Sequence, residues 1–159
     1  MIIQLPGSLN IIVNFIAWLI VHVTVSLSID RIQPNYFNPQ KWLYRKRGWE
    51  KDGKIYQNLF IIRKWKGYLP DGARVSRNRF RKKLRGNPDP TYLRRFIQET
   101  CRAELIHWVI FVFSVIFFIW NRWWIWMIIM TYALVVNMPC IITQRYNRIR
   151  LQKILGEHF

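Results

Sequence analysis

Three long apolar runs alternate with strongly charged segments along this chain of 159 residues. They cover residues 9–29, residues 104–120 and residues 123–143. Each run is close to the roughly 20 apolar residues that an α-helix needs to cross a bilayer. The pattern predicts an all-α integral membrane protein with about three transmembrane helices, folded as a single membrane domain over residues 1–159.

The first apolar run can also be interpreted as a cleaved signal peptide covering residues 1–28. A signal peptide begins with a positively charged region, but the preceding segment, MIIQLPGS, contains no Lys or Arg. The cleavage site that Ser26-Leu27-Ser28 would provide is also weak. The sequence therefore favours a retained first transmembrane helix.

A short polar connection, Asn121-Arg122, separates the second and third apolar runs. It is flanked by tryptophans, which collect where a membrane meets water (Trp120, Trp123, Trp124 and Trp126). These features predict an antiparallel hairpin with its turn at the membrane surface. Residues equally far from the turn then lie level, because both helices rise equally per residue. This register places His107 near Asn137.

The segment of residues 30–103 carries most of the 25 Lys and Arg residues, and Pro and Gly divide it into short pieces. One piece, residues 56–66, is predicted to be a short interfacial helix, because apolar residues precede a basic end. Leu69 to Gly72 is a predicted turn, and residues 79–85, RFRKKLR, are expected to face solvent or lipid. At Asp89-Pro90 a long helix should begin, with Asp89 as its cap, and continue unbroken into the second apolar run.

The net charge is +17, from 25 Lys and Arg against 8 Asp and Glu. Such an excess suits a partner with phosphate groups, and three membrane helices favour anionic lipid over nucleic acid. Nearly all positive charges lie in residues 30–103 and in the basic tail of residues 144–159. Because positive residues stay on the cytoplasmic side, we expect both segments in the cytoplasm and the N-terminus outside. Two cysteines are too few for a disulfide framework.

Glu104 and His107 form the most informative pair of the sequence. They are three residues apart on a predicted helix, so they share one face at the point where it enters the hydrocarbon. Ionisable residues at that depth are costly and generally functional. A carboxylate can orient a histidine that acts as a general base, so we expect His107 and Glu104 to be catalytic. The alternative is an interfacial pair that only anchors the helix.

The third run carries polar residues that can meet this pair. Asn137, Gln144 and Arg148 recur at a spacing that places them on one helix face, and Asn147 lies beside them. We expect these four residues to bind the substrate or a developing oxyanion. The alternative is that they only hold two membrane helices together.

No metal site is expected, because one Glu-x-x-His is half of a di-metal bundle motif and the second copy is missing. A phosphate-bearing substrate would instead meet the basic segment. Arg63 and Lys66 suit phosphates, and Trp65 suits a ring or sugar. With Asp71, these residues are the candidates for binding the phosphate and sugar groups of a donor. The same charges can also simply hold the protein on anionic lipid.

Three strings of the sequence resemble one known family. They are RKWKGYLPDG (63–72), ETCRAELIHW (99–108) and QRYNRIRL (144–151), and RAELIHW and QRYNR are their most specific parts. The resemblance is to the glycosyl-4,4'-diaponeurosporenoate acyltransferases, small bacterial membrane proteins of staphyloxanthin-type carotenoid synthesis. It runs in the same order and spacing from Asp30 to the tail.

The resemblance implies a multi-pass cell-membrane enzyme that esterifies the sugar hydroxyl of a glycosylated carotenoid with a fatty acyl group. The implied donor is acyl-CoA or an acyl carrier, as a co-substrate, and no cofactor is implied. The alternative function is a non-catalytic membrane protein that binds glycolipid or organises a biosynthetic complex. The acyl chain, the donor and the oligomeric state stay open at this point.

Overall fold

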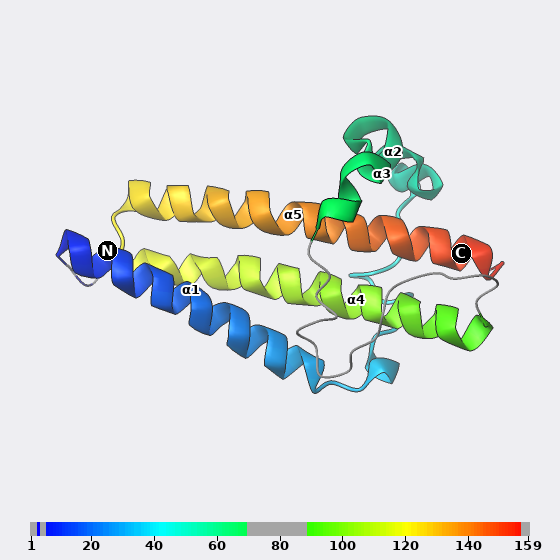
Figure 1. Ribbon diagram of the computed structural model, residues 1–159, viewed down its shortest axis with the longest axis horizontal. Coiled ribbons are helices and arrows are strands. Elements are labelled where there is room, and N and C mark those ends of the chain that lie inside the picture. The colour runs from blue at the N-terminus through cyan, green and yellow to red at the C-terminus, as the bar shows by residue number, and fades with distance from the viewer. Residues whose placement is uncertain (1–2, 4–5, 70–88, 157–159) are drawn as a thin grey trace.

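The computed structural model describes residue 3, residues 6–69 and residues 89–156. Within these residues the chain forms helices and turns without strands. Figure 1 shows three long helices running side by side: α1 (Gly7–Asp30), α4 (Pro90–Phe113) and α5 (Trp123–Ile154). Each is long and apolar enough to cross a membrane, α4 together with the turns that extend it to Ile119. The predicted all-α membrane fold with three spanning helices is therefore confirmed.

α4 begins where the sequence predicted it to begin. Pro90 is its first residue, and the Asp89 carboxylate accepts a hydrogen bond from the backbone N–H of Thr91 at 3.2 Å. The α-helix then tightens into a 3-10 helix, η5 (Ser114–Ile119), instead of continuing unchanged. The Ser114 hydroxyl donates to the Phe111 carbonyl, and this kind of back-bonding distorts helices.

α5 crosses Pro139 without ending and continues to Ile154, so most of the predicted basic tail is helical. The last turns of α5 are stabilised because their side chains are buried on more than one face of the helix. Tyr146, Arg148, Ile149 and Leu151 are all buried against α4 or against the segment that connects α1 to α4. Tertiary packing, rather than membrane thickness, therefore sets the length of α5.

The connecting segment contains only short helices. They are η1 (Pro34–Tyr36), η2 (Gly48–Gly53), α2 (Lys54–Phe60), α3 (Ile62–Trp65) and η3 (Lys66–Tyr68). The helix predicted over residues 56–66 is broken at Ile61, whose φ of 48° is left-handed. A β-branched residue rarely adopts this conformation. The break lets Tyr56 of α2 and Ile62 of α3 pack together on Tyr146 and Ile149 of α5. Figure 1 shows α2 and α3 lying over α5.

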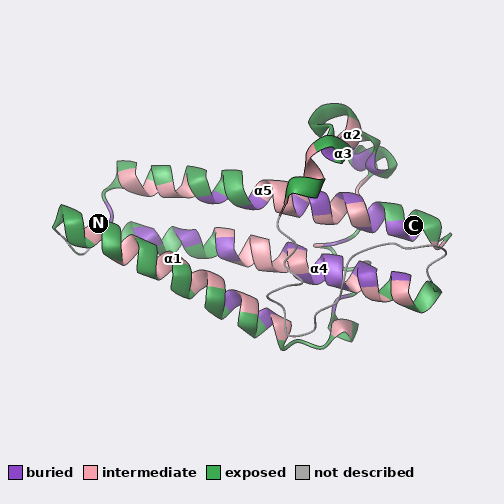
Figure 2. Cartoon of the chain, viewed as in Figure 1, coloured by how far each residue is buried: buried purple, intermediate pink, exposed green. Residues whose placement is uncertain are grey.

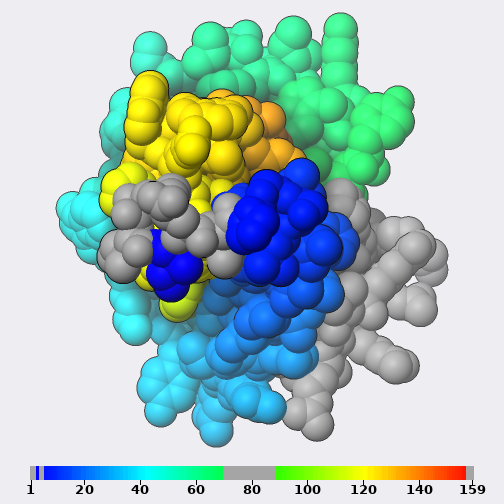
Figure 3. Space-filling model, turned by 90° about the vertical axis from the view of Figure 1, so that its left-hand side faces the viewer, coloured from blue at the N-terminus to red at the C-terminus, as the bar shows by residue number. Residues whose placement is uncertain are grey.

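α1 is held against the hairpin at both of its ends. At the hairpin turn, Asn14 and Asn121 exchange side-chain hydrogen bonds of 2.8 and 3.0 Å, and Asn121 is fully buried. Figure 3 shows the start of α1 and the hairpin turn forming the same end of the molecule. At the other end, Arg102 of α4 donates to the Ile32 carbonyl at 2.7 Å. α1 is therefore antiparallel to α4.

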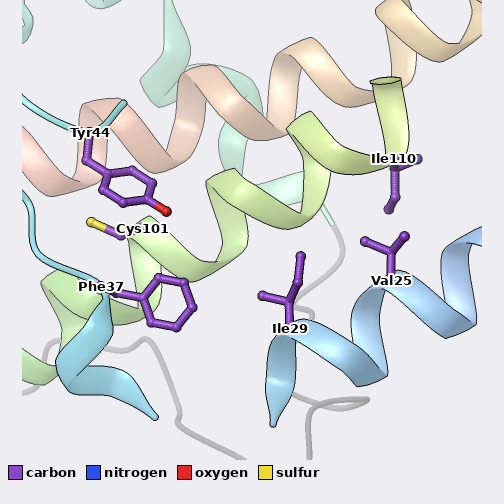
Figure 4. Close-up of a cluster of buried hydrophobic side chains, with 6 residues drawn as sticks. All are labelled: Val25, Ile29, Phe37, Tyr44, Cys101 and Ile110. Atoms are coloured by element: carbon purple, nitrogen blue, oxygen red, sulfur yellow. The ribbon is translucent and has the colours of Figure 1, made fainter. Parts of the chain in front are cut away.

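Burial is unevenly distributed along the bundle. Figure 2 shows exposed residues over much of α1 and over the part of α5 that follows the turn, and buried residues where the connecting segment covers α4 and α5. The exposed part is apolar, as expected for a surface that faces lipid. In the covered part, Val25 and Ile29 of α1 point toward Ile110 of α4, and the connecting segment brings Phe37 and Tyr44 to Cys101 (Figure 4).

The predicted turn from Leu69 to Gly72, beyond its first residue, and the basic run of residues 79–85 lie outside the described residues.

Candidate active site

The predicted hairpin register is confirmed by a direct contact across it. His107 Nδ1 of α4 lies 2.9 Å from Asn137 Oδ1 of α5. Asn137 is buried, whereas His107 is only half-buried, so the imidazole is the more accessible member of the pair. His107 therefore faces α5, and so does Glu104, whose carboxylate contacts Arg145 and Arg148 of the same helix. This arrangement agrees with the high cost of exposing ionisable side chains to lipid.

Asn137 fixes which ring nitrogen of His107 carries the hydrogen. The Asn137 amide nitrogen donates to the Ala133 carbonyl at 2.8 Å, which leaves its oxygen turned to the imidazole. An amide oxygen only accepts hydrogen bonds, so Nδ1 is the protonated nitrogen of the neutral ring. Nε2 then carries the lone pair, as a general base requires.

Glu104 is completely buried, with an exposed fraction of 0%, and its carboxylate binds two arginines of α5. One oxygen lies 2.9 Å from Arg145 Nη1, and the other accepts from Arg148 Nη2. Trp108 Nε1 makes a longer contact of 3.4 Å to the same carboxylate. Glu104 thus joins the two most specific parts of the family resemblance, RAELIHW and QRYNR, in one ionic network.

The expected contact between the Glu104 carboxylate and the His107 imidazole is not among the contacts of this network. A helical side chain leans toward the N-terminus of its helix, so Glu104 leans away from His107. In the antiparallel hairpin this direction leads to Arg145 and Arg148, whose own side chains lean back toward Glu104. Glu104 and His107 share a helix face, but the side chain that contacts the His107 imidazole across the hairpin is Asn137.

A second buried carboxylate, Glu50, completes the network and was missed by the sequence analysis. Arg145 Nε donates to Glu50 at 2.9 Å, and the Tyr56 hydroxyl and the Arg47 backbone N–H also donate to this carboxylate. Arg145 therefore bridges Glu50 and Glu104. The only sequence signal was a pair of acids, Glu50 and Asp52, inside a very basic segment, YRKRGWEKDGK (44–54).

Electrostatics favour the ionised form of Glu50. Burial alone would raise the pKa of the Glu50 carboxyl, but the hydrogen bonds from Arg145, Tyr56 and Arg47 outweigh burial and lower it. Burial raises the pKa of the Tyr44 hydroxyl to about 12, and the charges of Cys101 and Glu104 add to this effect. Glu50 is thus a charged member of the network, whereas Tyr44 remains neutral at physiological pH.

Arg148 is also almost fully buried, with 1% of its surface exposed. Its Nε donates to the Tyr44 carbonyl at 3.1 Å, and its guanidinium lies over the Tyr44 ring. One nitrogen, Nη1, is buried without a hydrogen-bond partner in the part of the chain that the structure describes. Arg148 therefore ties the connecting segment to the hairpin.

The other predicted site residues divide between two sides of α5. Gln144 is half-buried and lies about two turns from Asn137, on the same face. Asn147 instead accepts a hydrogen bond from Lys66 at 3.1 Å. Tyr146, which binds Arg63, is about two and a half turns from Asn137 and so faces the opposite way.

The predicted donor-binding residues are consequently separated from His107. Arg63 and Lys66 lie against the side of α5 that is turned away from α4. Trp65 donates its indole N–H to the Phe60 carbonyl at 2.6 Å and packs on the cluster around Tyr56, so part of its surface is already covered. Asp71 lies outside the described residues.

Comparison with known proteins identifies the family. A sequence model described as glycosyl-4,4'-diaponeurosporenoate acyltransferase matches residues 39–157. Two curated proteins with that name, from two strains of Staphylococcus aureus, are 36% identical over 138 residues, which is 87% of this chain and 83% of each relative. No solved structure matches the chain. The match covers the ionic network, His107 and Asn137, and the chain belongs to the glycosyl-4,4'-diaponeurosporenoate acyltransferase family.

Proposed function

We propose that this protein is a membrane-bound acyltransferase that esterifies the sugar hydroxyl of glycosyl-4,4'-diaponeurosporenoate with a fatty acyl group. The observation that carries the proposal is the family match over most of the chain, together with the names of the relatives. The half-buried imidazole of His107, oriented by Asn137 between two membrane helices, supports a general base at this position. A purely scaffolding protein would not need such a group.

The proposed reaction begins when Nε2 of His107 takes the proton from the sugar hydroxyl. The hydroxyl oxygen attacks the carbonyl carbon of an acyl thioester and forms a tetrahedral oxyanion. When the intermediate collapses, the carbon–sulfur bond breaks and the ester forms. The leaving thiolate receives the proton from the imidazolium, which restores the neutral base.

The other polar residues receive different roles. Asn137 is a positioning residue, because its amide oxygen is engaged by His107. Gln144 is the proposed oxyanion donor, since it lies on the same face of α5 and is half-buried. Glu104 and Arg148 hold the hairpin and the connecting segment together, and the spare Nη1 of Arg148 is a second candidate donor.

The proposed donor is acyl-CoA or an acyl carrier, and no cofactor is proposed. The carotenoid would lie in the bilayer with its sugar at the cytoplasmic interface, near His107. The bilayer of the bacterial cell membrane would contain the three helices, with the N-terminus outside.

The purified full-length protein tests this function directly. Incubation with a fatty acyl-CoA and glycosyl-4,4'-diaponeurosporenoate should give an ester whose mass exceeds that of the glycoside by one fatty acid less one water, with one free CoA thiol released per ester. Binding of the glycoside without ester formation, with acyl-CoA and also with an acyl carrier, would favour the non-catalytic alternative.

The orientation is tested by labelling cysteines from outside intact cells. In a Cys140→Ser background, Lys54→Cys should stay unlabelled by a membrane-impermeant maleimide, because the basic connecting segment lies in the cytoplasm in this proposal. Arg122→Cys, which is also exposed but lies in the hairpin turn, is the matched control and should be labelled. The reverse pattern would invert the proposed topology.

Replacing Asn137 tests its positioning role. Asn137→Ala should lower kcat by about tenfold, because it removes the one hydrogen bond that orients the His107 imidazole. KM for both substrates should be nearly unchanged. Asn137→Asp keeps an acceptor oxygen and should retain more of the activity. Thr143→Ala, a buried polar change on the same helix, is the control and should leave kcat near the native value. Equal losses in the Ala and Asp variants would contradict the role.

A further inference from the structure

Three cations surround the ring of Tyr146 on the side of α5 that is turned away from α4. Arg63 Nε donates to the Tyr146 hydroxyl at 2.9 Å, and Lys66 Nζ lies 5.1 Å from the ring centroid. The guanidinium carbon of Arg150 lies 5.6 Å from the same centroid. Tyr146 itself is buried, so it holds these side chains, which come from α3, η3 and α5, at fixed places around one ring.

The positive charge of this cluster is not neutralised within the described residues. None of the ion pairs found there includes Arg63, Lys66 or Arg150. Arg145 and Arg148 on the other side of α5 differ, because each of them binds a carboxylate. Partial burial, followed by the charges of Arg150 and Arg63, lowers the pKa of the Lys66 ammonium. Like charges gathered in this way favour an anion between them.

An apolar ridge lies beside the cluster. Leu59, Phe60 and Ile61, at the junction of α2 and α3, are exposed by 67%, 41% and 44%. The left-handed Ile61 lies between two short helices and turns the chain so that three consecutive large apolar residues face outward. Strained backbone of this kind is concentrated at functional sites. Apolar residues followed directly by cations are the pattern of an element that lies in a membrane interface.

We propose that Arg63, Lys66 and Arg150 bind the phosphate of an anionic phospholipid, whose acyl chains lie against Leu59, Phe60 and Ile61. The charges complement the headgroup, and the ridge complements its chains. The donor of the acyl transfer is the poorer occupant, because α5 stands between this cluster and His107. The site goes beyond the proposed function and does not depend on it.

The test measures lipid binding to the detergent-solubilised full-length protein by native mass spectrometry. The probes are phosphatidylglycerol, phosphatidylcholine and adenosine 3',5'-bisphosphate, a soluble stand-in for the phosphates of CoA. The cluster variant is Arg63→Gln/Lys66→Gln/Arg150→Gln. The matched control is Lys54→Gln/Lys64→Gln/Lys153→Gln, which removes three exposed charges from the same region, two of them beside Asp52.

Phosphatidylglycerol should bind the cluster variant about a hundredfold more weakly than the control, since each of the three interfacial cations contributes about a fivefold factor. Phosphatidylcholine should bind all three proteins alike. Equal phosphatidylglycerol affinity in cluster variant and control would overturn the proposal. Loss of adenosine bisphosphate binding, with phosphatidylglycerol binding kept, would instead assign the cluster to the acyl donor. If the triple variant does not fold, Arg150→Gln and Lys153→Gln are compared, and a difference below about threefold overturns the proposal.

Discussion

Replacing His107 with alanine is expected to lower the rate of acyl transfer by about a hundredfold to ten-thousandfold. The imidazole is the group that would take the proton from the attacking hydroxyl, and no other described side chain of the site is a neutral base oriented by a buried amide. Because His107 is half-buried and is not part of the ionic network, its loss should leave insertion and folding intact.

The measurement is the accumulation of unacylated glycosyl carotenoid in cells that carry each variant, with the amount of protein in the membrane determined by blot. His22→Ala is the matched control, because His22 is also half-buried in a membrane-spanning helix but contacts the Trp18 ring in α1. Cells with the control should make the acylated pigment normally. Acylated pigment at the native rate in the His107→Ala cells would show that this histidine is structural.

Glu104→Gln is expected to lower the stability of the fold, and to lower activity mainly through that loss of stability. The change leaves the buried guanidinium of Arg148 without its carboxylate, and breaking a buried ion pair in this way costs about 3–5 kcal/mol. For a chain of this size the unfolding temperature should fall by about 10 °C. Activity should fall with the amount of folded protein, and the remaining folded molecules should keep their base.

Thermal unfolding of the purified variants in one detergent checks this result. Asp52→Asn is the matched control, since it removes a carboxylate from an ion pair with Lys46 that is exposed to solvent, and it should change the unfolding temperature little. The double change Glu104→Gln/Arg148→Met should recover part of the loss, because Arg145 still has Glu50. If Glu104→Gln unfolds at the native temperature but has lost all turnover, the carboxylate is catalytic and not part of the scaffold.

The hairpin and its register could be predicted from the sequence because they depend on few, local signals. Asn121-Arg122 marks the turn, Asp89-Pro90 marks the start of α4, and equal rise on both helices brings His107 to Asn137. In a membrane, the length of each apolar run and the positions of the tryptophans are enough to locate the spanning helices. This is so because a chain in lipid must satisfy its backbone hydrogen bonds internally, and a helix does so within one segment.

The partners of the charged residues could not be predicted in the same way. A shared helix face predicts proximity of Glu104 and His107, but long arginines from α5 reach the carboxylate and outweigh that proximity. Glu50 lies 95 residues from Arg145, a separation over which no sequence pattern specifies a contact. The left-handed break at Ile61 also depends on packing against α5, because the local sequence favours a continuous helix.

The contact between Asn14 and Asn121 has a consequence for how the protein is made. These residues are 107 positions apart, and at about 5–20 residues per second the ribosome needs roughly 5–20 seconds to synthesise the interval. During this time Asn14, already within the emerging first helix, has Asn10 as its side-chain partner instead of the hairpin turn. Polar amides in lipid are costly until they are satisfied. Newly made α1 should therefore stay beside the insertion machinery, and leave it only when the hairpin arrives.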